Sequence, residues 1–213
     1  MQRKTKKKNR NKPFILLTIL IFALAIFTNL GHFPFHFFYT PGQDAPETLD
    51  GIPFYTDYLP DGSVARPGTK RRILYVTIHE TDNPSASADA QAHNTYLHEI
   101  ASSKKLSWHY TVDDHQIYRH IPDDEIAFNA GDGYTKDGGN MGGISIEMCV
   151  NAGGDYEQTL KNTAKLTAYL LRTYDLSIDQ VKKHQDFSGK NCPSRLLAAG
   201  RWPEFLEMVQ KEL

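Results

Sequence analysis

The sequence predicts an α/β fold, built as one domain that follows an N-terminal apolar segment. Segments with the composition of strands alternate with segments of helical periodicity from residue 71 to the C-terminus. Such alternation is typical of α/β domains. The chain has 213 residues, of which 40% are hydrophobic. That content supports one domain with a proper core, but not two large ones.

The predicted strands are short and rich in β-branched and aromatic residues. The first is "ILYVTI", residues 73–78, which is apolar on both faces. We therefore expect a central strand that is covered on both sides. Two further strands are expected in "SWHYTVDD" and "QIYRHI", which join near Asp113, and another in "GISIEMCVN".

Three helices are expected around these strands. The first has Ser85 or Ser87 as its candidate N-cap. The second opens at Asp155, with Gln158 three residues later as a variant of the capping box. The third covers about residues 203–211. The inward-facing stripes are Ala90, His93, Leu97 and Ile100 in the first helix, and Leu160, Ala164, Thr167, Leu171 and Tyr174 in the second.

The N-terminus has the features of a membrane anchor. Residues 1–13 contain seven basic residues and no acidic one, and residues 14–30 form an uncharged apolar run. At 17 residues the run lies at the short end of the lengths that span a bilayer. The bases hold their flank in the cytoplasm, so we expect a single-pass anchor with the rest of the chain outside the cell. The alternative is a secreted protein, cleaved after the A-x-A sequence at residues 23–25.

The remaining chain divides into a spacer with its lead-in, residues 31–70, and a main domain, residues 71–213. Frequent Pro and Gly in the first of these segments permit no long helix or central strand. Outside the basic tail the chain carries 17 basic and 25 acidic residues. Such an acidic body argues against a nucleic-acid partner, and we expect a monomer.

Two segments carry candidate catalytic chemistry. In "GISIEMCVN", Glu147 lies on the strand face opposite the isoleucines, where burial is costly unless the carboxylate has a partner or faces a cleft. In "HQDFSGKNCP", His184 and Cys192 are connected by a loop that can bring them to one ion. Catalytic zinc takes three protein ligands and prefers imidazole nitrogen and thiolate sulfur. His79, at the end of the first strand, is the candidate third ligand.

Other residues leave alternatives open. Cys149 is a packed thiol, a replacement for Cys192 as ligand, or its partner in a disulfide; we expect the packed thiol. His109 and Phe128 are candidates to line a substrate groove, although a structural histidine and a core aromatic are equally compatible with the pattern.

Five motifs in order resemble the type 2 zinc-dependent N-acetylmuramoyl-L-alanine amidases, above all the endolysins and autolysins of Gram-positive bacteria. The motifs are "VTIHET", "SWHYTVDD", "HIPDDEIAFNAGDG", "GISIEMCVN" and "HQDFSGKNCPSRLLAAGRW". The likeness runs from Tyr75 to Phe205. It implies a central mixed sheet flanked by helices, with a Zn²⁺ site in a groove at one edge. Relatives often have Trp then His or Ala where this chain has Phe128 and Asn129.

The resemblance also implies roles for individual residues. It places the zinc ligands at His79, His184 and Cys192, the catalytic glutamate at Glu147, and a lysine that many relatives carry at Lys190. The implied reaction is hydrolysis of the amide between N-acetylmuramic acid and L-alanine in peptidoglycan. Glu147 would act as general base and then general acid, and Lys190 would stabilise the oxyanion. The alternatives are a peptidoglycan-binding module without activity and a zinc peptidase that cuts within the stem peptide.

Overall fold

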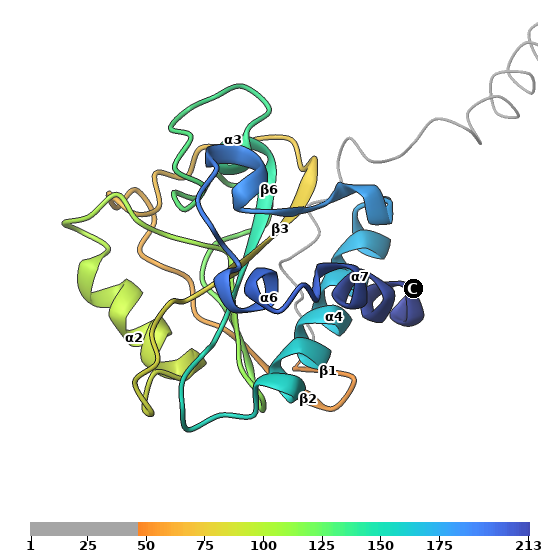
Figure 1. Ribbon diagram of the computed structural model, residues 1–213. Helices are drawn as coiled ribbons and strands as arrows, with labels where there is room; N and C mark the ends of the chain where they lie inside the picture. Colours follow the sequence, from red (N-terminus) through yellow and green to blue (C-terminus); the bar gives the residue numbers. More distant parts are fainter. Residues whose placement is uncertain (1–46) are drawn as a thin grey trace, which may run out of the picture. The chain divides into compact units, whose positions relative to one another are not determined.

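A mixed β-sheet of seven strands organises residues 47–213, the part of the chain that the computed structural model describes (Figure 1). The strand order across the sheet is β1-β2-β5-β4-β6-β3-β7. The strands are β1 (Thr48–Leu49), β2 (Ile52–Thr56), β3 (Tyr75–Glu80), β4 (Tyr110–Val112), β5 (Ile117–Arg119), β6 (Gly143–Met148) and β7 (Val181–Lys183).

Four neighbouring strands of this sheet run parallel. β3 lies between β6 and β7 and is parallel to both, and β6 is parallel to β4. The other pairs mix directions, because β5 is antiparallel to β4 but parallel to β2. The prediction that the first apolar run forms a central strand is confirmed, with β3 beginning at Tyr75 rather than at residue 73.

Helices cover both faces of the sheet. They are α2 (Ala90–Ile100), α3 (Gly139–Gly142), α4 (Tyr156–Thr173), α5 (Gln185–Ser188), α6 (Ser194–Ala198) and α7 (Trp202–Glu212), with a short 3-10 helix, η3 (Ile178–Gln180). In Figure 1, α4 and α7 lie on one side of the central strands and α2 lies on the other. The predicted α/β fold with a mixed sheet and flanking helices is confirmed.

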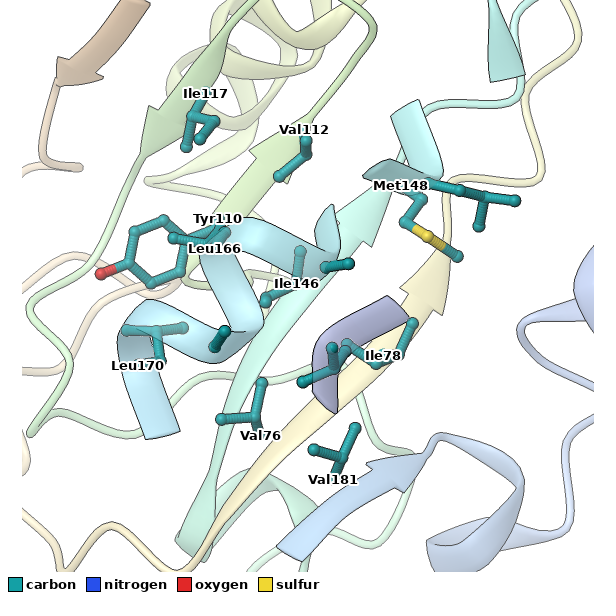
Figure 2. Close-up of a cluster of buried hydrophobic side chains, with 14 of the residues drawn as sticks. Val76, Ile78, Tyr110, Val112, Ile117, Ile146, Met148, Leu166, Leu170 and Val181 are labelled. Atoms are coloured by element: carbon teal, nitrogen blue, oxygen red, sulfur yellow. The ribbon is translucent and has the colours of Figure 1, made fainter. Parts of the chain in front are cut away.

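The main core lies between the sheet and α4. Alternate side chains of β6, Ile144, Ile146 and Met148, are fully buried there (Figure 2). Val76 and Ile78 of β3 join them. A second cluster under α2 includes Leu97, Ile100 and Trp108. Because both faces of the central strands are covered, every residue of β6 is buried, including its polar ones.

The helix starts agree with the sequence in one case and differ in another. Asp155 caps α4 as predicted, since its side chain accepts hydrogen bonds from the backbone N–H groups of Glu157 and Gln158. The Gln158 side chain donates instead to Asn162, so the predicted capping-box variant does not form. For α2 the serine caps were wrong. The N-cap is Asp89, whose carboxylate accepts from the backbone N–H of Ala92 at 2.8 Å.

The lead-in contributes two short strands that the sequence did not predict. Pro53 lies in β2 but outside the register with β5, which pairs only with residues 54–56. The proline therefore removes no donor from that ladder.

The predicted basic tail and anchor, residues 1–30, lie outside the described residues. Within residues 47–213, no helix combines the length and the apolar character needed to cross a membrane.

The buried His120 connects β4 to α2 through hydrogen bonds. His120 is fully buried between Thr111 Oγ1, at 2.8 Å, and Asn94 Oδ1, at 3.0 Å. Trp108 Nε1 donates to the same threonine oxygen at 2.7 Å. This burial lowers the pKa of His120 to about 3. The imidazole is therefore neutral in the folded protein at any pH where the domain is expected to work.

Lowering the pH should destabilise the domain partly through His120. The unfolded chain binds a proton near the ordinary pKa of 6.5, whereas the folded chain binds it only near 3. The stability that His120 contributes is therefore present above pH 6.5 and is lost as the pH falls toward 3, with a slope of up to ~1.4 kcal/mol per pH unit. Urea unfolding in chelator between pH 7 and 4 should show a shallower slope for His120→Gln than for the natural chain.

The matched control is His115→Gln. His115 is an exposed histidine whose pKa is raised, chiefly by its hydrogen bond to Asp114. Removing a group with a raised pKa should not make the slope shallower. Equal slopes for His120→Gln and the natural chain would contradict the role given to His120.

Candidate metal centre

The carboxyl ends of three parallel strands bring the predicted site residues together. His79 of β3 stands directly opposite Glu147 of β6 in the strand register. His184 follows β7, and its backbone N–H donates to the carbonyl of Ile78 at 3.2 Å. Ligands in open α/β sheets commonly bind at this end of the parallel strands.

The three predicted metal ligands converge in the structure. One ligand atom from each of His79, His184 and Cys192 lies within 4.8 Å of the other two, and all three residues are buried. The Nδ1 atoms of the two histidines are 3.0 Å apart. Cys192 Sγ lies 3.4 Å from the backbone nitrogen of Glu80, which anchors the sulfur at the end of β3.

The donor set fits a zinc ion. Two imidazoles and one thiol are the ligand types that zinc prefers, and three protein ligands leave a position for water or substrate. Burial lowers the pKa of His79 far below its ordinary value, and proximity to His184 and Lys190 lowers it further. Burial also lowers the pKa of His184. Both rings are therefore neutral at pH 7, as metal ligands must be.

The Cys192 thiol is protonated without a metal. Burial and the nearby Glu147 raise its pKa to about 12. A divalent cation would replace this proton, because the thiolate is the ligand form of cysteine.

Glu147 lies beside the cluster with one oxygen unsatisfied. Its Oε1 is 3.9 Å from His79 Nδ1, and its Oε2 has no hydrogen-bond partner within the described part of the chain. Burial raises the pKa of Glu147 to about 8, although the positive charge of Lys190 acts to lower it. A buried carboxyl group without a partner is costly, so its position calls for a ligand or a reacting group.

A cavity of about 510 Å³ opens over Glu147. One wall comes from α2 and the segment after it, and the other from the segment that follows β3. The first wall includes Ala92, His93, Tyr96, Leu106 and Trp108, and the second includes Asp82, Asn83, Ser85 and Ser87. The lining therefore combines mostly apolar side chains from α2 and the segment after it with polar ones from the segment after β3, and it includes Glu147.

Lys190 also lines this cavity. Its Nζ lies 3.3 Å from Asp82 Oδ2, and its side chain is about half exposed. Burial lowers the pKa of Lys190, but the hydrogen bond to Asp82 and the surrounding negative groups raise it by more. The ammonium group thus stays charged while it faces the same space as Glu147.

The second cysteine lies outside the cluster. Cys149 and Cys192 are both free and buried, so the disulfide alternative is wrong. Cys149 Sγ instead lies 3.9 Å from His93 Nδ1 of α2. The packed-thiol interpretation of Cys149 is confirmed.

The two groove candidates differ in outcome. His109 does not line the cavity: it is fully buried, with Nδ1 at 2.9 Å from Ser145 Oγ and Nε2 at 3.0 Å from the Glu125 carbonyl. Both ring nitrogens are thus used within the fold, which agrees with the structural alternative for His109 rather than with the groove position. Phe128 is largely buried but lines a second cavity of about 370 Å³, together with Lys105 and Asn129.

Together, the fold and the site define an α/β domain with a buried His–His–Cys cluster suited to a metal, beside a carboxylate that lines an open cavity. Comparison with known families identifies it further. The family model described as N-acetylmuramoyl-L-alanine amidase, Amidase_2, matches residues 69–195. The chain belongs to this family.

Known relatives agree with that assignment. The chain is 39% identical over 153 residues to the N-acetylmuramoyl-L-alanine amidase CwlH of Bacillus subtilis, covering 72% of this chain and 59% of that protein. It is 40% identical over 149 residues to XlyA of the same organism, covering 70% and 48%. The chain thus spans only about half the length of these relatives. The solved catalytic domain of XlyA superimposes with a TM-score of 0.69 at 38% identity, covering 74% of this chain and 99% of that domain.

Replacing Cys192 with Ser should weaken zinc binding by more than ~10²-fold. Removing a residue that only hydrogen-bonds to a metal ligand typically costs ~10–100-fold in affinity, and removing the ligand itself should cost more. Competition with a chromophoric chelator measures the affinity, and metal analysis should find about one zinc per natural chain. Cys149→Ser is the matched control, because Cys149 is equally buried but lies outside the cluster. Loss of binding in Cys149→Ser with retention in Cys192→Ser would contradict the assignment.

Proposed function

We propose that this chain hydrolyses the amide bond between N-acetylmuramic acid and L-alanine in peptidoglycan. The observation that carries the proposal is the convergence of His79, His184 and Cys192 beside the unsatisfied carboxylate of Glu147. Membership of the amidase family and the names of the relatives CwlH and XlyA support it.

The proposed cofactor is Zn²⁺, held by His79, His184 and Cys192. When bound, zinc supplies a Lewis acid and lowers the pKa of water from 15.7 to about 7, which makes a strong nucleophile available at neutral pH. The buried neutral imidazoles and the thiol hold their positions through the strand register and the backbone contact of Glu80.

Glu147 is the proposed proton carrier. Glu147 lines the cavity, and its unpartnered oxygen is buried beside the cluster, so it can take a proton from the attacking water and deliver it to the nitrogen of the leaving L-alanine. The proton has to reach that nitrogen, because an amide releases a poor leaving group otherwise. Such general acid–base action contributes ~10²–10⁴-fold to a rate.

Lys190 is the proposed partner of the negative charge that develops on the carbonyl oxygen. Its ammonium group shares the cavity with Glu147 and is held by Asp82. A cation positioned beside the carbonyl oxygen stabilises such an oxyanion more than the ground-state carbonyl. The apolar wall of α2 and the polar wall opposite would then orient the sugar–peptide junction.

Mass spectrometry of defined muropeptides should show release of intact stem peptides with a new L-alanine amino terminus. Glu147→Gln should keep zinc and slow this release by at least ~10²-fold, because the amide cannot carry the proton. Glu157→Gln, which alters an exposed glutamate of α4, should leave the rate unchanged.

Two outcomes would contradict the proposed reaction. A new amino terminus at a residue other than L-alanine would indicate a peptidase. Binding of muropeptides with no product from the zinc-loaded chain would indicate a module without activity.

The proposed location is the cell membrane, with residues 14–30 as an anchor, residues 1–13 in the cytoplasm, residues 31–70 as a spacer and lead-in, and the catalytic domain, residues 71–213, outside. The supporting observations are the charge-free apolar run and the seven bases before it. In this orientation the catalytic domain faces its proposed substrate.

Protease added to intact protoplasts should remove an epitope tag fused to the C-terminus, because the anchor model places that end outside. A protected tag would show that the orientation is wrong. Release of the tagged protein into the medium, shortened at its N-terminus, would favour the cleaved alternative.

A further inference from the structure

Glu80 is a buried carboxylate that the proposed reaction does not use. It ends β3, directly after the ligand His79, and only 2% of it is exposed. Burying a carboxylate is costly unless hydrogen bonds or charges compensate it. Its surroundings therefore decide what it contributes.

Four donors from two other elements surround the Glu80 carboxylate. The backbone N–H of Arg195 donates to Oε2 at 2.6 Å, and that of Leu196 donates to Oε1 at 3.2 Å. The Tyr156 hydroxyl of α4 donates to Oε1. The Ser194 hydroxyl lies 3.3 Å from Oε2 and shares its single proton between this oxygen and Asp82 Oδ1. Within residues 47–213, no lysine or arginine forms an ion pair with Glu80, so N–H and O–H groups alone compensate its charge.

These donors belong to the segment that follows Cys192. Helix α6 begins at Ser194, two residues after the thiol ligand. The main chain of Glu80 contacts the thiol as well, since its N–H points to Cys192 Sγ at 3.4 Å. One residue thus holds the sulfur through its backbone and the segment beyond the sulfur through its side chain.

The same contacts extend to the polar wall of the cavity. The Ser194 hydroxyl also lies 3.0 Å from Asp82 Oδ1, and the other oxygen of Asp82 contacts Lys190. Glu80 is therefore linked to both ends of the loop between Lys190 and α6.

We propose that Glu80 is a positioning residue that places the Cys192 sulfur for metal binding by fixing the start of α6 to the end of β3. The inference rests on the proposed metal site. It assigns to Glu80 no contact with substrate. Without its carboxylate, His79 keeps its place on β3 and His184 keeps its place after β7, but the thiol loses the bonds that hold its loop.

The test compares Glu80→Gln with the natural full-length chain. The amide replaces one acceptor oxygen with an NH₂ group, which faces donors and cannot accept from them. Zinc affinity, measured by chelator competition, should fall by ~10–100-fold. In the cobalt-substituted chain, the charge-transfer absorption from thiolate to cobalt should weaken, because the histidine ligands remain while the sulfur is displaced.

Glu125→Gln is the matched control for lost stability. Glu125 is similarly buried and accepts hydrogen bonds from Arg66 and Lys70, and none of these residues belongs to the metal cluster. This variant should lower the free energy of unfolding but leave zinc affinity and the cobalt absorption unchanged. Tyr156→Phe removes one donor to Glu80 and should weaken zinc binding less than Glu80→Gln does. If Glu80→Gln fails to fold, the zinc affinity of Tyr156→Phe tests the positioning role in its place.

The results separate this inference from the proposed function. If the natural chain binds zinc and the Glu80 and Tyr156 variants bind it equally well, the positioning role is wrong and the metal site stands. If Glu80→Gln and Glu125→Gln lose affinity alike, Glu80 acts only through global stability and the inference is likewise wrong. A natural chain that binds no zinc would overturn both the metal site and the role of Glu80.

Discussion

The parallel pairing of β3 with β6 and β7 is the constraint on which the site depends. It sets His79 opposite Glu147, and it places the end of β7 beside Ile78, so that His184 follows directly at the cluster. A shift of β6 by one residue would turn Glu147 toward the apolar core and an isoleucine toward the cavity, because side chains alternate between faces. The burial of Ile144, Ile146 and Met148 opposes that shift, so the apolar core maintains the geometry of the polar site.

Desolvation determines the electrostatics of this site. Burial is the largest influence on the pKa of all three cluster residues and of Glu147, and it favours the uncharged form of each. A divalent cation would reverse this balance for the thiol and the carboxylate, because each gains a positive partner. The neutral, crowded cluster is therefore well suited to hold such an ion.

Much of the central architecture could be predicted, because it follows from local patterns. The apolar run of β3, the alternation in β6 and the aspartate cap of α4 each encode their structure within a few residues. β7 could not be found in this way, since "VKK" has no apolar pattern and becomes a strand only through pairing with β3. The residue types and the short loop between His184 and Cys192 made these two candidate ligands, with His79 as the candidate third, and the family resemblance implied the same set. Nothing local in the sequence places His79 beside the other two. The position of His109 depended on Ser145 and the Glu125 carbonyl, which only the tertiary fold brings to it.

Glu80 and Glu147 show how one sequence pattern leads to two roles. Both are buried glutamates near the carboxyl ends of neighbouring central strands, and both border the same cavity. Their difference lies in the partners: Glu80 accepts from two backbone N–H groups and the Tyr156 hydroxyl and shares the Ser194 hydroxyl with Asp82, whereas an oxygen of Glu147 has no partner within the described part of the chain. A carboxylate whose oxygens accept hydrogen bonds fixes the structure around it. One with an unpartnered oxygen is tolerated where a ligand or substrate completes its environment. The environment, not the residue type, therefore separates the group that positions the thiol from the group proposed to carry the proton.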